Sequence, residues 1–415
     1  MTTRLLMTAD AVGGVWQYAT ELARALVPHG VETTIAVLGP APTDAQLAEL
    51  RAASPPIPTP AKAGAQSRCA VERRSDPAAV PSLDPGLRRG VPQGGVTVVP
   101  TTLPLDWLAT GPDPALAAGE AIADLARDLR ADIVHLNSPT LAAKARFAQP
   151  VVAVAHGCIA TWWRAANGCA PDAAYAWQTD LMRAGLLAAD ATVAPSASFA
   201  ADLQATYALP IAPLAIHNGR NSPSPPRGEG QSCEAARGQG QCAPYAFTAG
   251  RLWDRVKGTA VLDHVAERLS IPLRAAGPVT GPHGETAAPE HLHLLGNLPA
   301  PALAAELARR PVFVSAATFE PFGLAVLEAA QAGCALVLSD IPTFRELWDG
   351  AALFVPADND VAYAAVIEEL LADTIQRDAL GQAALRRAAR YTPEATAAAM
   401  ADIYARLLPA RKAAA

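Results

Sequence analysis

A chain of 415 residues, 51% of them hydrophobic, is long enough to form two or three domain cores. Its formal net charge of -6 and the lack of any long basic run argue against a nucleic-acid-binding protein. No apolar stretch approaches the roughly 20 residues that span a bilayer, and the segment after Met1 lacks the apolar core of a signal peptide. We therefore expect a cytoplasmic protein, with peripheral contact to a membrane left open.

The cysteines show no CxxC pair and no zinc-like cluster, so we expect neither a disulfide nor a metal site. They are Cys69, Cys158, Cys169, Cys233, Cys242 and Cys334.

Strand-like and helix-like segments alternate along almost the whole chain, which favours an α/β fold with parallel sheets. In the first half we expect strands near 4–8, 31–38, 96–100, 132–137, 151–156, 190–194 and 214–217. The helices expected there lie near 15–28, 117–130, 175–188 and 198–207.

The second half repeats the alternation. Its expected strands lie near 246–250, 272–276, 292–295, 312–315, 335–339 and 352–355. Its expected helices lie near 258–269, 299–309, 322–332, 343–348 and 359–373, followed by helices from 375 to 409 with a break near Thr392 and Pro393. Thr343 and Glu346 have the spacing of a capping box for one of these helices.

Two segments break the pattern, at residues 54–95 and 220–243. Both are rich in Pro, Gly, Ser and Arg and have little apolar periodicity. Such segments cannot bury enough surface to offset the entropy of ordering. We interpret them as disordered surface insertions; alternatively, the first is a loop that binds an acceptor or a partner.

Tandem glycines, Gly13 and Gly14, follow the first predicted strand and open a helix. They would let the backbone approach a ligand closely, although a plain tight turn explains them equally well. A GxGxxG fingerprint is missing here, which argues against a dinucleotide-dependent oxidoreductase.

A histidine, His156, stands at the carboxyl end of a predicted buried strand, an edge that faces the ligand crevice in open α/β sheets. We take it as a candidate catalytic residue; the alternative is a buried core histidine. Trp162, Trp163 and Arg164 follow, and they suit either contacts with a sugar and an anion or plain packing.

A cationic loop from Arg251 to Lys257 follows the strand near 246–250, and Gly258 opens the next helix. Two fixed positive charges there could stabilise a leaving group that gains negative charge. The alternative is a solvated loop whose cations pair with Asp254.

The most informative segment runs from Phe319 to Glu328, between a buried strand and a helix. The free N–H groups and the dipole of the helix start favour an anion such as a diphosphate. Glu320 and Glu328 would be repelled by phosphate, so we expect them to accept hydrogen bonds from sugar hydroxyls. The alternative is a surface helix with two unrelated acidic residues.

This segment resembles the paired-glutamate signature of retaining glycosyltransferases of family 4 (glycosyl transferases group 1), which have the two-domain GT-B fold. The resemblance implies that Glu320 contacts the donor sugar and Glu328 the ribose. It also implies that backbone amides at Gly323 and Leu324 hold the diphosphate, with Phe322 in the same donor site.

The resemblance extends to the other motifs. It implies that Arg251 and Lys257 contact the diphosphate, that the Gly13-Gly14 loop faces the cleft, and that His156 lies near the donor sugar. His217-Asn218-Gly219 resembles a family segment at the entry to the interdomain region, which we interpret as structural.

The implied architecture is GT-B, with two Rossmann-like doubly wound domains facing a central cleft. We expect an acceptor-side domain at 1–218, a linker at 219–244 and a nucleotide-sugar-binding domain at 245–390. A C-terminal helix at 391–415 is expected to cross back to the first domain.

The implied function is transfer of a sugar, with retention, from a nucleotide-sugar donor to a hydroxyl acceptor by front-face attack. The donor is a substrate, and neither a cofactor nor a metal is expected. The base, the sugar, the acceptor, the pathway and the oligomeric state are left open. Three alternatives are also left open. One is another GT-B reaction, such as epimerisation or phosphorolysis, and the second is a degenerate protein that binds the donor without turnover. The third is an oxidoreductase, which the missing GxGxxG fingerprint disfavours.

Overall fold

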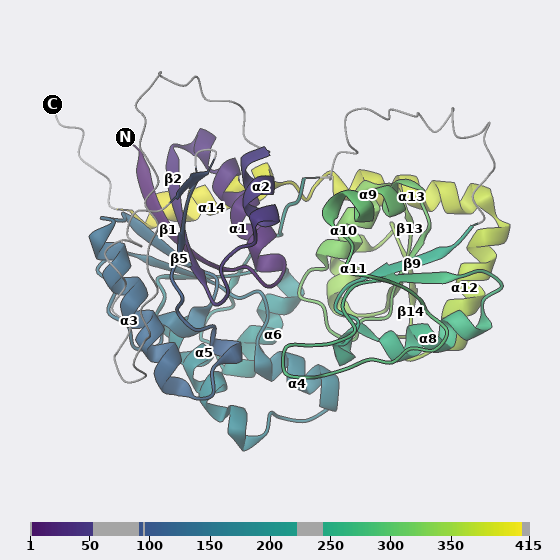
Figure 1. Cartoon of the computed structure of the whole chain (residues 1–415), viewed down its shortest axis with the longest axis horizontal. Coiled ribbons are helices and arrows are strands. Elements are labelled where there is room, and N and C mark those ends of the chain that lie inside the picture. The colour runs from purple at the N-terminus through teal and green to yellow at the C-terminus, as the bar shows by residue number, and fades with distance from the viewer. Residues whose placement is uncertain (1, 53–90, 94–95, 222–243, 409–415) are drawn as a thin grey trace, which may run out of the picture. The chain divides into compact units, whose positions relative to one another are not determined.

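The computed structural model describes residues 2–52, 91–93, 96–221 and 244–408 (Figure 1). They form two compact units. Unit 1 comprises the described residues within 1–154, 180–191 and 401–415, and unit 2 comprises those within 155–179 and 192–400. The predicted domain boundaries and the predicted cleft stay predictions.

Most of the two predicted insertions lies outside the described residues. The exceptions are residues 91–93, which form a short strand, and residues 220 and 221. The predicted insertion 54–95 therefore contains one short strand.

Among the described residues, the first sheet has eight strands in the order β3-β4-β2-β1-β5-β6-β7-β8. The central strand β1 pairs in parallel with β2 and β5, and the edge strand β3 runs antiparallel to its neighbour β4. The bounds are β1 Thr3–Asp10, β2 Val31–Leu38, β3 Val91–Gln93, β4 Val96–Pro100, β5 Ile133–Leu136, β6 Val151–Val154, β7 Ala191–Ala194 and β8 Leu214–Ala215.

The second sheet has six described strands, all parallel, in the order β11-β10-β9-β12-β13-β14. Their bounds are β9 Ala246–Ala249, β10 Leu273–Ala276, β11 His293–Gly296, β12 Val312–Ser315, β13 Ala335–Ser339 and β14 Leu353–Val355. Numbered within the sheet, this is the order 3-2-1-4-5-6 of a doubly wound Rossmann fold.

Helices follow the strands in both units. Their bounds are α1 Gly14–Ala25, α2 Asp44–Ala52, α3 Pro112–Asp128, α4 Ile159–Asn167, α5 Ala176–Ala188, α6 Ala197–Tyr207, α8 Thr259–Arg268, α9 Ala300–Ala308, α10 Leu324–Gln331, α11 Pro342–Trp348, α12 Asp360–Ala372, α13 Thr374–Ala388 and α14 Pro393–Leu407. Short 3-10 helices are η1 Val27–His29, η2 Asp106–Leu108, η3 Pro139–Ala142, η4 Ala173–Tyr175 and η5 Arg255–Lys257.

The second sheet is buried on both faces, as its apolar strand sequences require. Along β12, Phe313 packs into the core under α10 and α13, while Val312 and Val314 pack into the core under α8 and α12. This alternation follows the two-residue period of a strand. Helices thus cover both faces of the sheet (Figure 1).

The predicted α/β class and the predicted strands are confirmed, each strand within a few residues. The predicted helices are present as well. Helices α2 and α4 and strand β3 were not predicted from the sequence. Helix α4 has only nine residues and includes Thr161, Trp162 and Trp163, which are weak helix formers.

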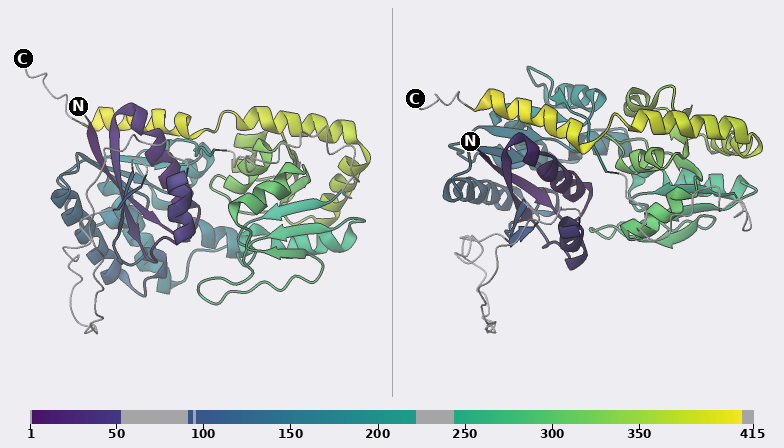
Figure 2. Two further views of the ribbon diagram at one scale, coloured as in Figure 1. Left: turned by 45° about the horizontal axis from the view of Figure 1, so that its top comes forward. Right: turned by 90° about the horizontal axis from the view of Figure 1, so that it is seen from above.

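The last turns of α14 belong to unit 1, where they lie beside β1 and α1 (Figure 2). The Tyr404 hydroxyl lies 2.7 Å from Nδ1 of His135 on β5, and His135 Nε2 lies 3.0 Å from Asn137 Oδ1. Asn137 Nδ2 donates to the Thr8 carbonyl, so its Oδ1 is the acceptor. His135 is therefore neutral, donating from Nε2 and accepting at Nδ1 from Tyr404.

Burial lowers the pKa of His135 to about 4, although the Asn137 hydrogen bond opposes this. Between that value and about pH 6.5, the unfolded chain binds a proton at this residue that the folded chain does not. The free energy of unfolding should therefore fall by about 3 kcal/mol as the pH falls through this window.

Urea unfolding at about pH 7 and about pH 4.5 measures this loss. His135→Gln is the matched control, because all other titrating groups are the same in the variant and in wild type. The variant should lose less stability than wild type as the pH falls. Equal losses in wild type and His135→Gln would contradict the assignment.

Candidate functional site

The carboxyl ends of β9 and β12 form the topological switch point of the second sheet. These strands are neighbours, and their connections lead to opposite halves of the sheet. Open α/β sheets bind ligands in the crevice at such a point. The loop after β9 carries Arg251 and Lys257, and the loop after β12 carries Glu320, so the strand order brings two of the predicted motifs to one edge.

Lys257 and Glu320 meet across this switch point. Lys257 Nζ donates to Glu320 Oε2 at 2.7 Å, and each side chain is about four-fifths buried, with 19% and 20% exposed. An ion pair that is largely shielded from water holds its geometry better than an exposed one. The pair places one cation and one carboxylate where a charged ligand would enter.

Glycine at position 258 allows the two loops to approach. Its φ is 70°, and a Cβ there would lie 2.3 Å from the carbonyl oxygen of Ala316. The Thr318 N–H donates to the Val256 carbonyl at 2.8 Å, which fixes the approach. Any other residue at 258 would push the loop after β9 away from the loop after β12.

The turn before α10 has the sequence Pro321-Phe322-Gly323. Gly323 has a φ of 94° and caps the helix, Leu324 is its first residue, and Phe322 is buried in the core of the unit. The first N–H groups of α10 thus follow directly after Glu320 in the same loop.

Arg251 lies in the loop after β9 but pairs with Asp254, as the alternative interpretation expected. Its Nη2 is 2.8 Å from Asp254 Oδ2, its side chain is 56% exposed, and its guanidinium lies 5.5 Å from the Trp253 ring centroid. Lys257 does not share this carboxylate. One of the two predicted cations is therefore half-exposed, while the other is held by Glu320.

Asp254 is buried and organises the whole loop. Besides Arg251, it accepts hydrogen bonds from the Trp162 indole N–H at 2.9 Å and from the Val256 N–H at 3.3 Å. The second bond caps the 3-10 helix η5. Trp162, considered as a sugar-stacking residue, thus has its polar atom engaged with this loop.

Glu328 is buried in α10 and forms an ion pair with Arg220. Burial raises the pKa of the Glu328 carboxyl, and the positive charge of Arg220 opposes that rise. The alternative interpretation, a surface helix with two unrelated acidic residues, is therefore wrong for Glu328. Arg220 itself was not predicted, because it is the first residue of the segment 220–243, which was interpreted as a disordered insertion, and it lies more than a hundred positions earlier in the chain.

The remaining predicted residues belong to other loops of the chain. Gly13 and Gly14 follow β1 in unit 1, where Asp10 Oδ1 accepts from the N–H groups of Val12 and Gly13. A Cβ at Gly13 would meet nothing within 4 Å, so local packing does not require glycine there. His156 lies in unit 2, partly exposed, between β6 and α4.

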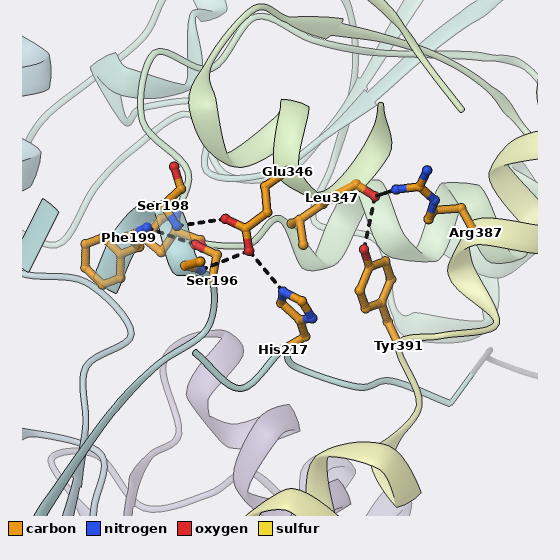
Figure 3. Close-up of polar contacts among 10 residues, drawn as sticks. Ser196, Ser198, Phe199, His217, Glu346, Leu347, Arg387 and Tyr391 are labelled. Atoms are coloured by element: carbon orange, nitrogen blue, oxygen red, sulfur yellow. Dashed lines mark hydrogen bonds and ion pairs between the residues drawn. The ribbon is translucent and has the colours of Figure 1, made fainter. Parts of the chain in front are cut away.

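A further polar cluster was not predicted (Figure 3). The Glu346 carboxylate accepts hydrogen bonds from the N–H groups of Ala197 and Ser198 at 2.8 and 2.7 Å, and lies 3.0 Å from His217 Nε2. Burial would raise the pKa of Glu346, but the His217 contact and the two N–H groups outweigh it and hold the pKa below its ordinary value. The predicted capping box is wrong: Ile341 is the N-cap of α11, and Glu346 binds the start of α6 instead.

This cluster reaches the turn that precedes α10. Ser196 Oγ donates to the Pro321 carbonyl at 2.8 Å and accepts from the Phe199 N–H. The Pro321-Phe322 turn is thereby tied to the start of α6, so Glu346 and Ser196 support the site without belonging to either predicted motif.

In the part of the chain that the structure describes, no group of three His, Cys, Asp or Glu side chains could hold a metal ion. The described cysteines, Cys158, Cys169 and Cys334, are free thiols. None of the described helices is both long and apolar enough to cross a membrane.

Two family models match the chain. The model described as Glycosyltransferase Family 4 matches residues 12–221, about half of the chain, and the model described as Glycosyl transferases group 1 matches residues 284–387. No curated protein matches the chain in sequence.

Solved structures share the fold at low sequence identity. Sucrose-phosphate synthase from Thermosynechococcus elongatus has 17% identity and a TM-score of 0.72, with 99% of this chain and 100% of that chain covered. HepE of Anabaena, in complex with UDP and glucose, has 14% identity and a TM-score of 0.67, with 98% and 100% covered. A glycosyltransferase from Rickettsia africae has 16% identity and a TM-score of 0.65, with 99% and 100% covered. These likenesses show the GT-B fold.

Replacing Asp254 by Asn should destabilise the protein by about 1–3 kcal/mol, because a buried carboxylate that accepts two hydrogen bonds and pairs with Arg251 loses its charge and one accepting oxygen. Asp202→Asn is the matched control, since Asp202 forms an exposed ion pair with Arg164 worth about 0–1 kcal/mol. Urea unfolding of the two variants makes the comparison. Equal destabilisation would show that Asp254 does not organise the loop.

Proposed function

The chain belongs to glycosyltransferase family 4 and is a glycosyltransferase, and from that premise we propose that it moves a sugar from a nucleotide-sugar donor to a hydroxyl acceptor with retention of configuration. The acceptor is a glycan, a glycolipid or a small molecule. A cytoplasmic location, with peripheral membrane contact left open, is part of the proposal.

The observation that carries the proposal is the Lys257–Glu320 pair at the switch point between β9 and β12. A nucleoside diphosphate gains negative charge as the glycosidic bond breaks. A cation fixed beforehand at that point stabilises the transition state more than the ground state. Glu320 orients Lys257 and, as an acceptor, suits the hydroxyls of the donor sugar.

The start of α10 supplies the second support. The N–H groups at Gly323 and Leu324 carry the positive end of the helix dipole, which favours the diphosphate. Phe322 fixes the turn from the core. Arg251 is half-exposed, so its guanidinium can exchange its contact with Asp254 for a phosphate oxygen when the donor binds.

The proposed mechanism is front-face attack. The acceptor hydroxyl enters on the side from which the diphosphate leaves, and the departing phosphate oxygen takes the hydroxyl proton. The new glycosidic bond then lies on the same face as the old one, which gives retention. His156 is proposed to lie near the donor sugar, and the Gly13-Gly14 loop near the diphosphate; the step requires neither a metal nor a cofactor.

HepE of Anabaena was solved with UDP and glucose, which is consistent with a nucleotide-sugar donor for this chain. The base and the sugar of the donor are what the first experiment identifies.

Wild type should slowly release one nucleoside diphosphate from a panel of UDP-, GDP- and ADP-sugars without added acceptor. Lys257→Ala and Glu320→Ala should each lower the rate about 10²–10³-fold, since each removes a preorganised charge or acceptor at the reacting group. Enzyme-coupled detection of the released diphosphate measures the rates.

Lys144→Ala and Glu120→Ala, both at exposed positions in unit 1, are the matched controls and should keep the wild-type rate. Proton NMR of the first sugar released shows its anomeric configuration, and the inverted anomer would contradict retention. Binding without release, even with candidate acceptors, would favour the degenerate protein. A failure to bind any nucleotide sugar would overturn the proposal.

A further inference from the structure

Arg220 and Glu328 form the second shielded ion pair near the start of α10. Arg220 Nε meets Glu328 Oε1, and only 14% of the Arg220 side chain and 8% of the Glu328 side chain are exposed. In the first such pair, Lys257–Glu320, the glutamate lies in the loop that leads into the same helix. Each glutamate at this edge of the sheet is therefore matched by one cation.

The backbone holds Arg220 in place independently of its side chain. The Arg220 N–H donates to the Tyr391 carbonyl at 3.3 Å, and the Arg220 carbonyl accepts from Gln331 Nε2 at 2.6 Å. At Gly219, a Cβ would lie 2.0 Å from the Thr392 carbonyl, so the chain passes directly against the start of α14. The guanidinium thus meets Glu328 from a fixed position.

A buried carboxylate without a cation would take up a proton or destabilise the fold. Once protonated, it would be a weaker acceptor for a hydroxyl than the ionised form. Arg220 opposes that protonation. An ionised carboxylate has about four lone-pair sites, so contact with one guanidinium leaves capacity for further hydrogen bonds.

The pairing also removes the electrostatic repulsion between the two glutamates and a diphosphate. Two unpaired glutamates beside a diphosphate would repel it, whereas two ion pairs carry no net charge. The glutamates can then face the hydroxyls of the ligand while their cations cancel the repulsion.

We propose that Arg220 is a positioning residue for ribose recognition: it holds Glu328 ionised and oriented, so that Glu328 accepts hydrogen bonds from the ribose hydroxyls of the nucleotide. This inference rests on the proposed function, since it needs a nucleotide at this site. According to this proposal, Arg220 contributes to the preference for ribonucleotides. Arg220 does not contact the ligand itself and acts by positioning Glu328.

The experiment compares two ligands: the nucleoside diphosphate that wild type binds best among UDP, GDP and ADP, and its dideoxy analogue, which lacks both ribose hydroxyls. Calorimetry gives the ratio of their dissociation constants. Hydrogen bonds to a charged group predict a wild-type ratio of about 10–100. In Arg220→Gln this ratio should fall at least several-fold, and Glu328→Gln should lower it likewise.

The double variant Arg220→Gln/Glu328→Gln should show no further loss of selectivity, because both residues act through one carboxylate. Arg268→Gln removes the ion pair between a half-exposed arginine and Asp360 in the same unit and should leave the ratio unchanged. A purely structural role for Arg220 would lower the melting temperature without changing the ratio.

Thermal melts show which variants fold. If Arg220→Gln does not, Arg220→Lys carries the test: it keeps the charge but not the guanidinium geometry, and should lower the ratio. The inference would be overturned if the folded Arg220 variant kept the wild-type ratio. It would also be overturned if the variant bound the ribonucleotide more tightly than wild type, because Arg220 would then compete with the ribose hydroxyls for Glu328. Wild type that binds both ligands equally would overturn the inference alone, whereas wild type that binds no nucleotide would overturn the proposed function with it.

Discussion

Charge matching at the carboxyl edge of the second sheet is the constraint on which the site depends. A binding site for a diphosphate needs cations, and a binding site for sugar hydroxyls needs hydrogen-bond acceptors such as carboxylates. In the proposed site, both requirements are met near the carboxyl ends of β9 and β12. Lys257 pairs with Glu320, and Arg220 pairs with Glu328, each largely shielded from water. Without these pairs, the acids would repel the ligand or lose their charge.

The surrounding structure fixes the loops that carry these charges. Gly258 allows the loop after β9 to lie against the loop after β12, and buried Asp254 holds the first of these loops to α4. Ser196 ties the start of α6 to the turn that precedes α10, and Glu346 of α11 holds the same start of α6. These side chains do not need to touch a substrate to matter, because preorganisation depends on rigid support.

The sequence predicted the elements well because their signals are local. Apolar runs such as residues 312–315 mark buried strands, and Gly323 and Gly333 mark the ends of α10. The Lys257–Glu320 contact was not predictable from such signals, because it depends on the order of strands in the sheet. Arg220 and Glu328 are paired only by the tertiary fold. Glu346 shows the converse case, since its capping-box spacing was a valid local signal that tertiary hydrogen bonds to α6 overrode.

The most direct test of the account is amide hydrogen exchange with and without saturating UDP, GDP or ADP. A nucleotide bound at the switch point should slow exchange in residues 250–258 and 316–328, the loops that carry Lys257 and Glu320, for at least one of the three ligands. Exchange that stays unchanged in both loops, while a ligand binds and protects other segments, would contradict a site at the switch point between β9 and β12.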